Sequence, residues 1–496
     1  METLYHSTRD ASERMSSKQA ILTGIAPDGG LFVSDEISLS TLDLATVCAN
    51  DYHANARLVL GTLLPDYTAD EIAGCVEGAY AEQWDTRAIT PVSPVGNDWL
   101  LELYHGPTCA FKDVALQMLP RLMSAARTDA GGGRNVMILT ATSGDTGKAA
   151  LDGFANVEGT GVTVFYPDGK VSDVQRLQMV TQQGNNVAVC GIRGNFDDAQ
   201  TQVKSIFANE DVAARLLEHN TVLSSANSIN VGRLVPQVTY YFDAYAQLVR
   251  KGVLSCGQKL DFCVPTGNFG DVLAGYYAKC LGLPVNKLIV ASNENNVLTD
   301  FITTGTYDRR RPFHKTISPS MDILVSSNLE RLLYYLADGD CELVASYMND
   351  LASKGSYTVS KDILSKLNDS FACGFANDDA TRATIRSTWE DLGVLIDTHT
   401  AVGKAVLDKR ESDGFQRVCL STASPYKFSA DVLAALGSST QGLDGFACMD
   451  ELERITGTSA PSQLSGLRSA EELHTSVCDR DQMAAFVEDA CARVFS

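Results

Sequence analysis

One lysine stands where a strand-like stretch and a tight turn lead into a helix-like stretch. Residues 101–104 are apolar enough for a strand, residues 105–107 interrupt it with His-Gly-Pro, and the apolar spacing after Lys112 is that of a helix. A helix N-terminus carries partial positive charge, so we expect this position to lower the pKa of Lys112. A neutral lysine amine can condense with an aldehyde, whereas the alternative interpretation is a surface lysine at a helix start.

A glycine-rich turn follows the apolar run 260–264 and precedes a helical pattern that reaches Leu281. Such a turn presents backbone N–H groups to an anion, and the helix dipole adds to their attraction for a monophosphate. The alternative is an ordinary strand–helix turn with an acidic residue as the helix cap. The candidate residues of this turn are Gly267, Asn268, Phe269 and Asp271.

A hydroxyl-rich turn follows the apolar run 135–141. It does not match a P-loop, which needs glycine at position 142 and Ser or Thr at position 149, where this chain has Thr142 and Ala149. Its hydroxyl and N–H groups at a helix start suit a carboxylate or a phosphate, and the alternative is a capped helix without a ligand. The candidate residues are Thr142, Ser143, Asp145, Thr146 and Lys148.

Two more polar turns offer groups for a charged ligand. Ser228, Asn230 and Arg233 lie at the start of a helical pattern, and the guanidinium of Arg233 can bind an oxyanion in a bidentate manner. The alternative is that the amides and hydroxyls cap that helix. Thr422 follows the apolar run 417–420, where its hydroxyl could face the nitrogen of a heterocycle.

These turns share one place in a recurring pattern of apolar run, small-residue turn and helix. Strands that alternate with helices indicate parallel sheets covered on both faces, and ligands bind such sheets where the strands end. Residues 1–95 instead look mainly helical, and the two prolines at 90–94 indicate a linker that is neither helix nor strand. Residues 329–391 and 438–496 also look mainly helical.

The composition limits the classes of partner. The 496 residues carry a formal net charge of -21, which argues against nucleic acid or an anionic membrane as the partner. No apolar run approaches the roughly 18 residues of a membrane-spanning helix, and no signal or transit peptide is visible. The 13 cysteines are dispersed without a CxxC pair, so we expect reduced thiols, no metal site and a cytoplasmic protein.

A lysine that can form a Schiff base, a phosphate turn, an oxyanion turn and a strand-end hydroxyl together suit pyridoxal phosphate. The segments that carry them resemble the motifs of the threonine synthases, pyridoxal-phosphate-dependent enzymes of the tryptophan synthase β-type fold. In chain order the similar segments are STRD, APDGGLFV, HGPTCAFKDVALQ, ATSGDTGKAA, SSANSINVGR, VPTGNFGD and LSTASPYKF. The region after Ser438 matches no motif of the family.

The resemblance implies an α/β fold of two parallel-sheet domains, the fold type II architecture of pyridoxal phosphate enzymes, with a helical N-terminal region. It divides the chain into an N-terminal region at 1–95, a catalytic core of two interleaved subdomains at 96–437 and a helical C-terminal extension at 438–496. The implied reaction converts O-phospho-L-homoserine and water to L-threonine and phosphate. The implied assembly is a monomer or homodimer.

The resemblance also implies a role for each candidate residue. Lys112 would bind the cofactor aldehyde and then move protons at Cα and Cβ, and Thr422 would meet the pyridine nitrogen. The turn at 267–271 would hold the cofactor phosphate. The substrate carboxylate would be received by Thr142, Ser143, Asp145 and Thr146, and the substrate phosphate by Ser228, Asn230, Arg233 and Lys148.

Two rival functions stay open on the sequence. A related fold type II lyase, such as a threonine or serine dehydratase or a phospho-lyase, would share Lys112, the phosphate turn and Thr422, but a dehydratase would not need the anion-binding set around Arg233. A catalytically silent homologue would only bind phosphorylated ligands, and the presence of Lys112 argues against it. The absence of a Walker motif and of a GxGxxG motif argues against a mononucleotide-binding kinase or dehydrogenase.

Overall fold

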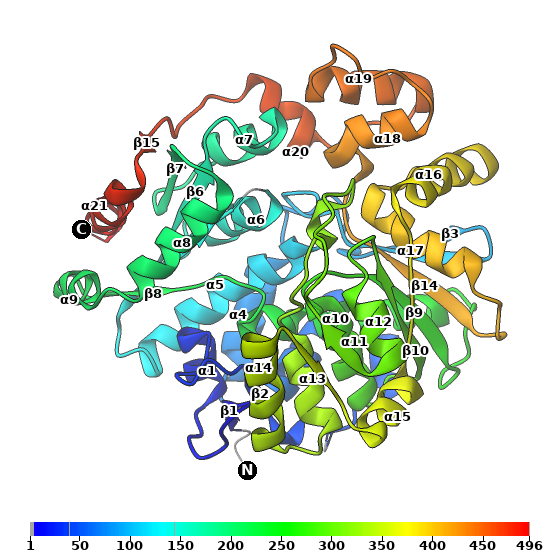
Figure 1. Cartoon of the computed structure of the whole chain (residues 1–496), viewed down its shortest axis with the longest axis horizontal. Helices are drawn as coiled ribbons and strands as arrows, with labels where there is room; N and C mark the ends of the chain where they lie inside the picture. The colour runs from blue at the N-terminus through cyan, green and yellow to red at the C-terminus, as the bar shows by residue number, and fades with distance from the viewer. Residues whose placement is uncertain (1–3, 39, 143, 496) are drawn as a thin grey trace.

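Two mainly parallel sheets lie in the two halves of the molecule (Figure 1). The computed structural model describes residues 4–38, 40–142 and 144–495. One sheet has six strands in the order β13-β10-β9-β14-β4-β3, and the other has five in the order β15-β7-β6-β5-β8. Every neighbouring pair is parallel except β3 and β4. The predicted α/β fold with two parallel sheets is therefore confirmed.

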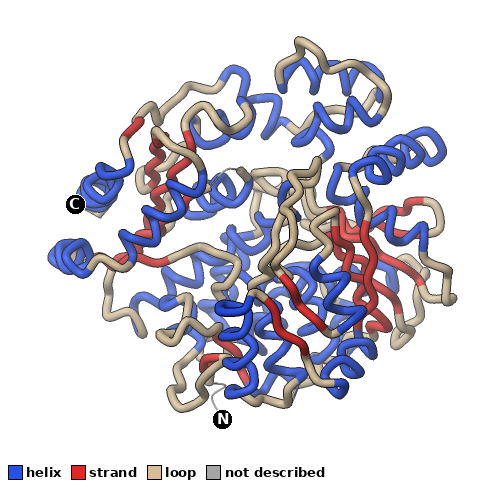
Figure 2. Tube along the Cα trace, in the orientation of Figure 1, coloured by secondary structure: helices blue, strands red, loops and turns tan. Residues whose placement is uncertain are grey.

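The two sheets appear in Figure 2 as separate groups of strands, in red. The six-stranded sheet is made of β3 (Val92–Val95), β4 (Asp98–Glu102), β9 (Leu260–Pro265), β10 (Val285–Ser292), β13 (Phe371–Phe375) and β14 (Gln416–Ser421). The five-stranded sheet is made of β5 (Asn135–Ala141), β6 (Thr160–Pro167), β7 (Val187–Ile192), β8 (Thr221–Ser224) and β15 (Val477–Cys478). Two short antiparallel pairs are β1 (Tyr5–Ser7) with β2 (Phe32–Ser34), and β11 (Thr306–Asp308) with β12 (Ser356–Thr358).

Helices cover the sheets and fill the space between them (Figure 1). The N-terminal helices are α1 (Ser17–Thr23), α2 (Leu44–Ala49), α3 (Tyr52–Leu63) and α4 (Ala69–Ala79). The next are α5 (Lys112–Asp129), α6 (Asp145–Phe154), α7 (Asp173–Val180), α8 (Phe196–Phe207), α9 (Glu210–Glu218), α10 (Val231–Arg250), α11 (Gly270–Cys280) and α12 (Val297–Thr304). The last are α13 (Leu329–Leu336), α14 (Cys341–Lys354), α15 (Lys361–Ser370), α16 (Asp378–Leu392), α17 (Thr398–Lys409), α18 (Ser429–Ala435), α19 (Gly445–Thr456), α20 (Ser462–Ser465) and α21 (Met483–Val494).

The central strand β9 shows why the six-stranded sheet is covered on both faces. Successive side chains of a strand point to opposite faces. Phe262 and Val264 belong to the apolar cluster that includes α10 and α11, whereas Cys263 between them belongs to the cluster that includes α17. All six residues of β9 are buried and all but Asp261 are apolar, as expected of a parallel strand between two helical layers.

The N-terminal region holds the helix that carries Lys112. The hydroxyl of Tyr80, which follows α4, donates to the carbonyl of Val114 in α5 at 3.0 Å. The hydroxyl of Tyr67 donates to the carbonyl of Leu122 in the same helix, also at 3.0 Å. Because both tyrosines are buried, these bonds fix α5 against the N-terminal helices.

The sequence missed the four edge strands of the two large sheets, of which β8 is one. Residues 90–94, expected to be a linker, overlap β3. Pro94 is tolerated there because an edge strand pairs on one side only, so the missing N–H of proline leaves no strand without a donor. β13 lies within the stretch 329–391, and the two-residue β15 lies within 438–496, both expected to be mainly helical. β15 pairs with β7, so the C-terminal extension completes an edge of the five-stranded sheet.

In the described ranges, none of the helices combines the length and apolarity needed to cross a membrane.

Candidate active site

The residue Lys112 is the first of α5, and its position is set by the end of β14. The backbone N–H of Phe111 donates to the carbonyl of Thr422 at 2.8 Å, and the N–H of Ser424 donates to the carbonyl of Cys109 at 3.1 Å. These two bonds tie the turn before Lys112 to the strand end that carries Thr422. Residues more than 300 positions apart in the chain therefore share one wall of the site.

The Lys112 amine lies in a buried and positively charged environment. Its side chain is 11% exposed, and Nζ lies 3.6 Å from Oδ2 of Asp145 and donates to Oγ of Ser320 at 3.3 Å. Burial lowers the pKa of Lys112, and the cations of Lys427 and Arg233 lower it further, against the opposing effect of Asp145. The lowered pKa expected from the sequence is confirmed, although burial is its main cause.

The carboxylate of Asp145 stands between two lysines. Its Oδ1 lies 3.0 Å from Nζ of Lys427, and its Oδ2 faces Lys112. Burial opposes ionisation of Asp145, but the charges of Lys427 and Lys112 outweigh it and hold the pKa of this carboxyl well below its usual range. Asp145 is therefore an anion at neutral pH.

The glycine-rich turn between β9 and α11 is shaped to receive an anion. The carbonyl of Gly267 accepts from Ser326 Oγ at 2.7 Å, and the carbonyl of Asn268 accepts from the N–H of Asn328 at 3.1 Å. The backbone N–H groups of residues 267–270 find no protein acceptor within the described ranges. Phe269 has a φ of 64°, the left-handed conformation that turns consecutive N–H groups to one side.

Close packing explains the glycine at the start of this turn. A Cβ at Gly267 would lie 2.6 Å from the carbonyl oxygen of Ser320, a backbone atom that cannot move aside alone. The turn and the segment that carries Ser320 therefore lie so close together that position 267 accepts only glycine.

A buried arginine without an anionic partner faces the same turn. Nη1 of Arg233 donates to the carbonyl of Ala226 at 3.0 Å, while its Nε is buried and unpaired. Burial lowers the pKa of Arg233 to about 10, which leaves it charged at neutral pH. No carboxylate in the described part of the chain forms an ion pair with it. A buried cation without a counter-ion is costly, and an anionic ligand bound beside it would remove that cost.

Four residues of the site were missed by sequence reasoning: Ser320, His399, Asp397 and Lys427. His399 accepts from the N–H of Ser320 at Nε2, at 3.1 Å, and its Nδ1 lies 2.7 Å from Oδ2 of Asp397. Asp397 thereby fixes the imidazole orientation and also caps α17. Lys427 comes from the short helix after Thr422. Only Asp397 gave a sequence signal, as an N-cap residue before a helix.

Most of the predicted residues meet in two adjoining cavities. The smaller, of about 90 Å³, is lined by Lys112, Thr146, Ser228, Arg233, Gly267, Asn268, Asp271 and Thr422, with Ser320 and His399 among the others. The larger, of about 870 Å³, is lined by Thr142, Asp145 and again by Lys112, Thr146, Asn268 and Ser320. The shared residues join the two cavities into one site at the C-terminal ends of β5, β9 and β14.

Three predicted residues that the structure describes do not line either cavity. Asn230 donates to the carbonyl of Ile21 and caps the N–H of Gly232, and Lys148 contacts Gln182 and lies 3.8 Å from Asp152. The buried ring of Phe269 packs near Phe371, so only its backbone faces the turn. Ser143 lies outside the described residues.

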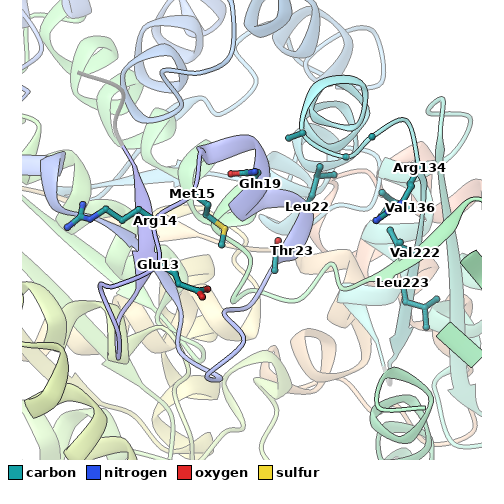
Figure 3. Close-up of a pocket in the computed structure, with 13 residues that line it drawn as sticks. Glu13, Arg14, Met15, Gln19, Leu22, Thr23, Arg134, Val136, Val222 and Leu223 are labelled. Carbon is teal, nitrogen blue, oxygen red and sulfur yellow. The ribbon is translucent and has the colours of Figure 1, made fainter. Parts of the chain in front are cut away.

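A further cavity of about 890 Å³ opens on the other side of Thr23 and Leu223, which line it and the 870 Å³ cavity alike (Figure 3). Figure 3 shows α1, β8 and the start of β5 around it, with Glu13 and Arg134 on opposite sides. None of the predicted site residues lines this cavity, so size alone does not identify the site.

The residues present fit pyridoxal phosphate. Lys112 offers an amine of lowered pKa to the aldehyde, residues 267–270 offer free N–H groups to the phosphate, and Thr422 offers a hydroxyl in the same small cavity. Among the described residues no cluster of His, Cys, Asp and Glu could hold a metal ion.

Three family models match the chain in order, and the last two overlap. Threonine synthase N terminus matches residues 4–80, pyridoxal-phosphate dependent enzyme matches 90–421, and threonine synthase, C-terminal matches 400–487. The last match extends past Ser438, so the expectation that this region has no likeness to the family is wrong.

Curated relatives carry related names. The chain is 40% identical over 442 residues to threonine synthase-like 1 of Homo sapiens, covering 86% of this chain and 59% of that protein. It therefore spans about three fifths of the length of that relative. It is 38% identical over 431 residues to threonine synthase of Pseudomonas aeruginosa, covering 86% of this chain and 88% of that one.

Solved structures agree in fold over the whole chain. A pyridoxal phosphate-bound threonine synthase from Brucella melitensis has a TM-score of 0.88 and 35% identity, and covers 99% of both chains. Threonine synthase from yeast has a TM-score of 0.87 and 32% identity, with the same coverage.

Proposed function

Because the chain belongs to the threonine synthase family of pyridoxal-phosphate-dependent enzymes, we propose that it converts O-phospho-L-homoserine and water to L-threonine and phosphate. One observation carries the proposal. The unpaired buried Arg233, the free N–H groups at 267–270 and the amine of Lys112 lie around one cavity that opens into a larger one. That cavity has groups for one aldehyde and for two phosphates.

The small cavity would hold the cofactor. Lys112 would bind the aldehyde carbon, the turn at 267–270 the phosphate and Thr422 the ring nitrogen. When bound, pyridoxal phosphate links to the substrate amine and withdraws electrons from Cα. Thr422 offers a neutral hydroxyl instead of a carboxylate, which favours elimination and replacement over transamination.

The two ends of the substrate need different partners. Arg233, with Ser228 beside it, supplies the fixed positive charge that a phosphate leaving group requires. Thr142 and Thr146 line the larger cavity and would receive the carboxylate through hydroxyl and N–H groups. Asp145 is an anion and would repel that carboxylate, so in the proposed mechanism it serves Lys112 instead of the substrate.

Lys112 would move the protons of the reaction. Displaced by the substrate amine, it takes the proton from Cα and becomes an ammonium that Asp145 stabilises from 3.6 Å. The amine would pass this proton on and take a second one from Cβ, whose electron pair expels the γ-phosphate toward Arg233. The second proton would be returned to Cγ, which becomes the methyl group. Water would then add its hydroxyl at Cβ, its own proton would go to the released phosphate, and the first proton would return to Cα. Ser320, within 3.3 Å of Nζ and fixed by His399, holds the amine close to these carbons.

A second candidate function would use the same site. Threonine synthase-like 1 is named for its likeness to the enzyme, and it is 40% identical to this chain. A phospho-lyase would share the site but release phosphate together with 2-oxobutanoate and ammonia. The third candidate, a silent homologue, would bind phosphorylated ligands without turnover.

One assay separates the three. Purified protein with pyridoxal phosphate is given O-phospho-L-homoserine, and phosphate, threonine and 2-oxobutanoate are measured together. Threonine equal to phosphate supports the proposal, whereas 2-oxobutanoate equal to phosphate favours the lyase. A cofactor absorption band that borohydride bleaches, and that Lys112→Ala removes, would show that Lys112 carries the cofactor. A colourless protein without product would favour the silent homologue.

The same proposal gives a cytoplasmic enzyme that acts as a monomer or homodimer on a small phosphorylated substrate. Light scattering on the purified holoenzyme measures the assembly directly.

A further inference from the structure

Lys427 is a second lysine of the site, and it lies behind Asp145. Its side chain is 1% exposed and lines neither of the two site cavities. Nζ lies 3.0 Å from Oδ1 of Asp145 and donates to the carbonyl of Thr108 at 2.8 Å. Since Lys112 faces the other carboxylate oxygen, one carboxylate serves two lysine amines.

The two amines lie at unequal distances from Asp145. Nζ of Lys427 is 3.0 Å from one carboxylate oxygen, whereas Nζ of Lys112 is 3.6 Å from the other. Lys427 is also held by the carbonyl of Thr108, whereas Lys112 has the hydroxyl of Ser320 at 3.3 Å. Because Coulomb attraction falls with distance, the charge of Asp145 is matched mainly by Lys427.

We propose that Lys427 is a positioning residue that takes up the charge of Asp145 and so leaves Lys112 as a free amine. Without Lys427, the buried pair of Asp145 and Lys112 would hold Lys112 as an ammonium, which cannot react with an aldehyde. The inference rests on the proposed function only in assigning that reaction to Lys112. Because Lys427 contacts Asp145 on the side away from the cavity, the side toward the cavity stays free for the substrate.

The same strand end delivers both groups. Thr422 follows β14, and the short helix Pro425–Phe428 places Lys427 one turn later. The N–H of Lys427 donates to the carbonyl of Ser424, whose own N–H is bound to Cys109 before α5. Lys427 is thus fixed to the backbone that carries Lys112, and its distance to Asp145 does not depend on a flexible loop.

Other charged groups surround the three residues and stay in place in the test. The charge of Arg233 influences the ionisation of Lys112, and the charge of Lys112 influences that of Asp271. His399 influences the ionisation of Asp145. The charge of Lys427 also influences the ionisation of Asp113 and Lys148.

The test measures how readily the Lys112 amine is acylated in cofactor-free protein. Trace acetic anhydride is reacted across a range of pH, and mass spectrometry gives the labelling midpoint of Lys112. Lys427→Met should raise this midpoint by about one pH unit, so that labelling near neutral pH falls about tenfold. Lys427→Arg keeps the charge and should keep the midpoint.

Two further variants make the result decisive. Lys354→Met, which removes a surface lysine paired only with Asp350, should leave the midpoint unchanged. Asp145→Asn should lower the midpoint, the opposite direction from Lys427→Met, and decides the matter if Lys427→Met does not fold. An unchanged midpoint in folded Lys427→Met, or no decrease in Asp145→Asn, would overturn the proposal.

The labelling needs neither substrate nor turnover. A protein that makes no threonine but shows both shifts would refute the proposed function and leave this inference standing.

Discussion

Two aspartates occupy the same place in the two halves of the molecule and behave in opposite ways. Asp145 opens α6 after β5 of the five-stranded sheet, and Asp271 lies in the first turn of α11 after β9 of the six-stranded sheet. Both are buried at a helix start. Burial raises the pKa of Asp271 to about 6, whereas two lysines hold the pKa of Asp145 well below its usual range.

The difference shows that the partners, and not the place in the fold, decide the charge. Asp271 accepts from the hydroxyl of Thr266 and the N–H of Val272 and forms no ion pair within the described ranges. An anion bound in the neighbouring turn would raise its pKa further, so Asp271 can take up a proton and avoid repelling a phosphate. Asp145 stays ionised and lies 3.6 Å from the amine of Lys112.

Removing the charge of Asp145 should have the largest effect. Asp145→Asn leaves the Lys112 ammonium without its carboxylate partner, and we expect kcat to fall about a hundredfold. Steady-state threonine formation measures it. Glu342→Gln, in the first turn of α14 and exposed, should stay within about twofold. A loss smaller than about fivefold in Asp145→Asn would contradict the role of Asp145.

Asp271→Asn should change stability rather than turnover. The pKa of this carboxyl is about 6 in the folded state against an ordinary 3.8, so between about pH 4 and 6 the folded protein holds a proton that the unfolded chain has lost. Its contribution to the free energy of unfolding therefore falls as pH rises through that window.

The Asn variant does not titrate and should escape this loss. Between about pH 4 and pH 7.5, the free energy of unfolding of the unmodified protein should therefore change less favourably, by about 3 kcal/mol, than that of Asp271→Asn. Urea unfolding of both proteins at both pH values measures this. Identical pH profiles for Asp271→Asn and the unmodified protein would rule out a raised pKa.

The two turns should also differ in their tolerance of a methyl group. Gly267→Ala places Cβ against the Ser320 carbonyl and should cost about 1–3 kcal/mol in stability or cofactor affinity. Gly144→Ala meets only the mobile end of Gln175, at 2.9 Å, and should cost less than about 1 kcal/mol. Thermal unfolding and cofactor titration measure both, and equal effects would mean that the first turn is not closely packed.

The smallest effect should come from Thr266→Val. This change removes the hydroxyl that stabilises the ionised Asp271, so its pKa should rise by less than about one unit. The pH profile of stability should move to higher pH by the same amount, and a movement to lower pH would contradict the assigned hydrogen bond.

The sequence was sufficient for the parts of the site that lie in strand–turn–helix units. Lys112 at the start of a helix and the turn at 267–271 were predicted because apolar runs, glycines and helical spacing are local signals. Ser320, His399 and Lys427 were missed because their role comes from contacts with distant residues, such as the 3.1 Å bond between Ser320 and His399. No local spacing records such a contact.

The fold shows the same limit. Buried strands such as β9 were predicted from continuous apolar runs. The edge strands β3, β8, β13 and β15 were missed, because they are short or contain proline or glycine and depend on a neighbouring strand for their conformation.

The place of β14 in the six-stranded sheet has a consequence in time. It lies between β9 and β4, yet its residues, 416–421, are made long after those strands. Because the chain is made from its N-terminus, the position between β4 and β9 stays unfilled until β14 has been made. Lys112 is therefore among the earlier residues to leave the ribosome, but the cavity that it lines is complete only when the chain has reached Thr422.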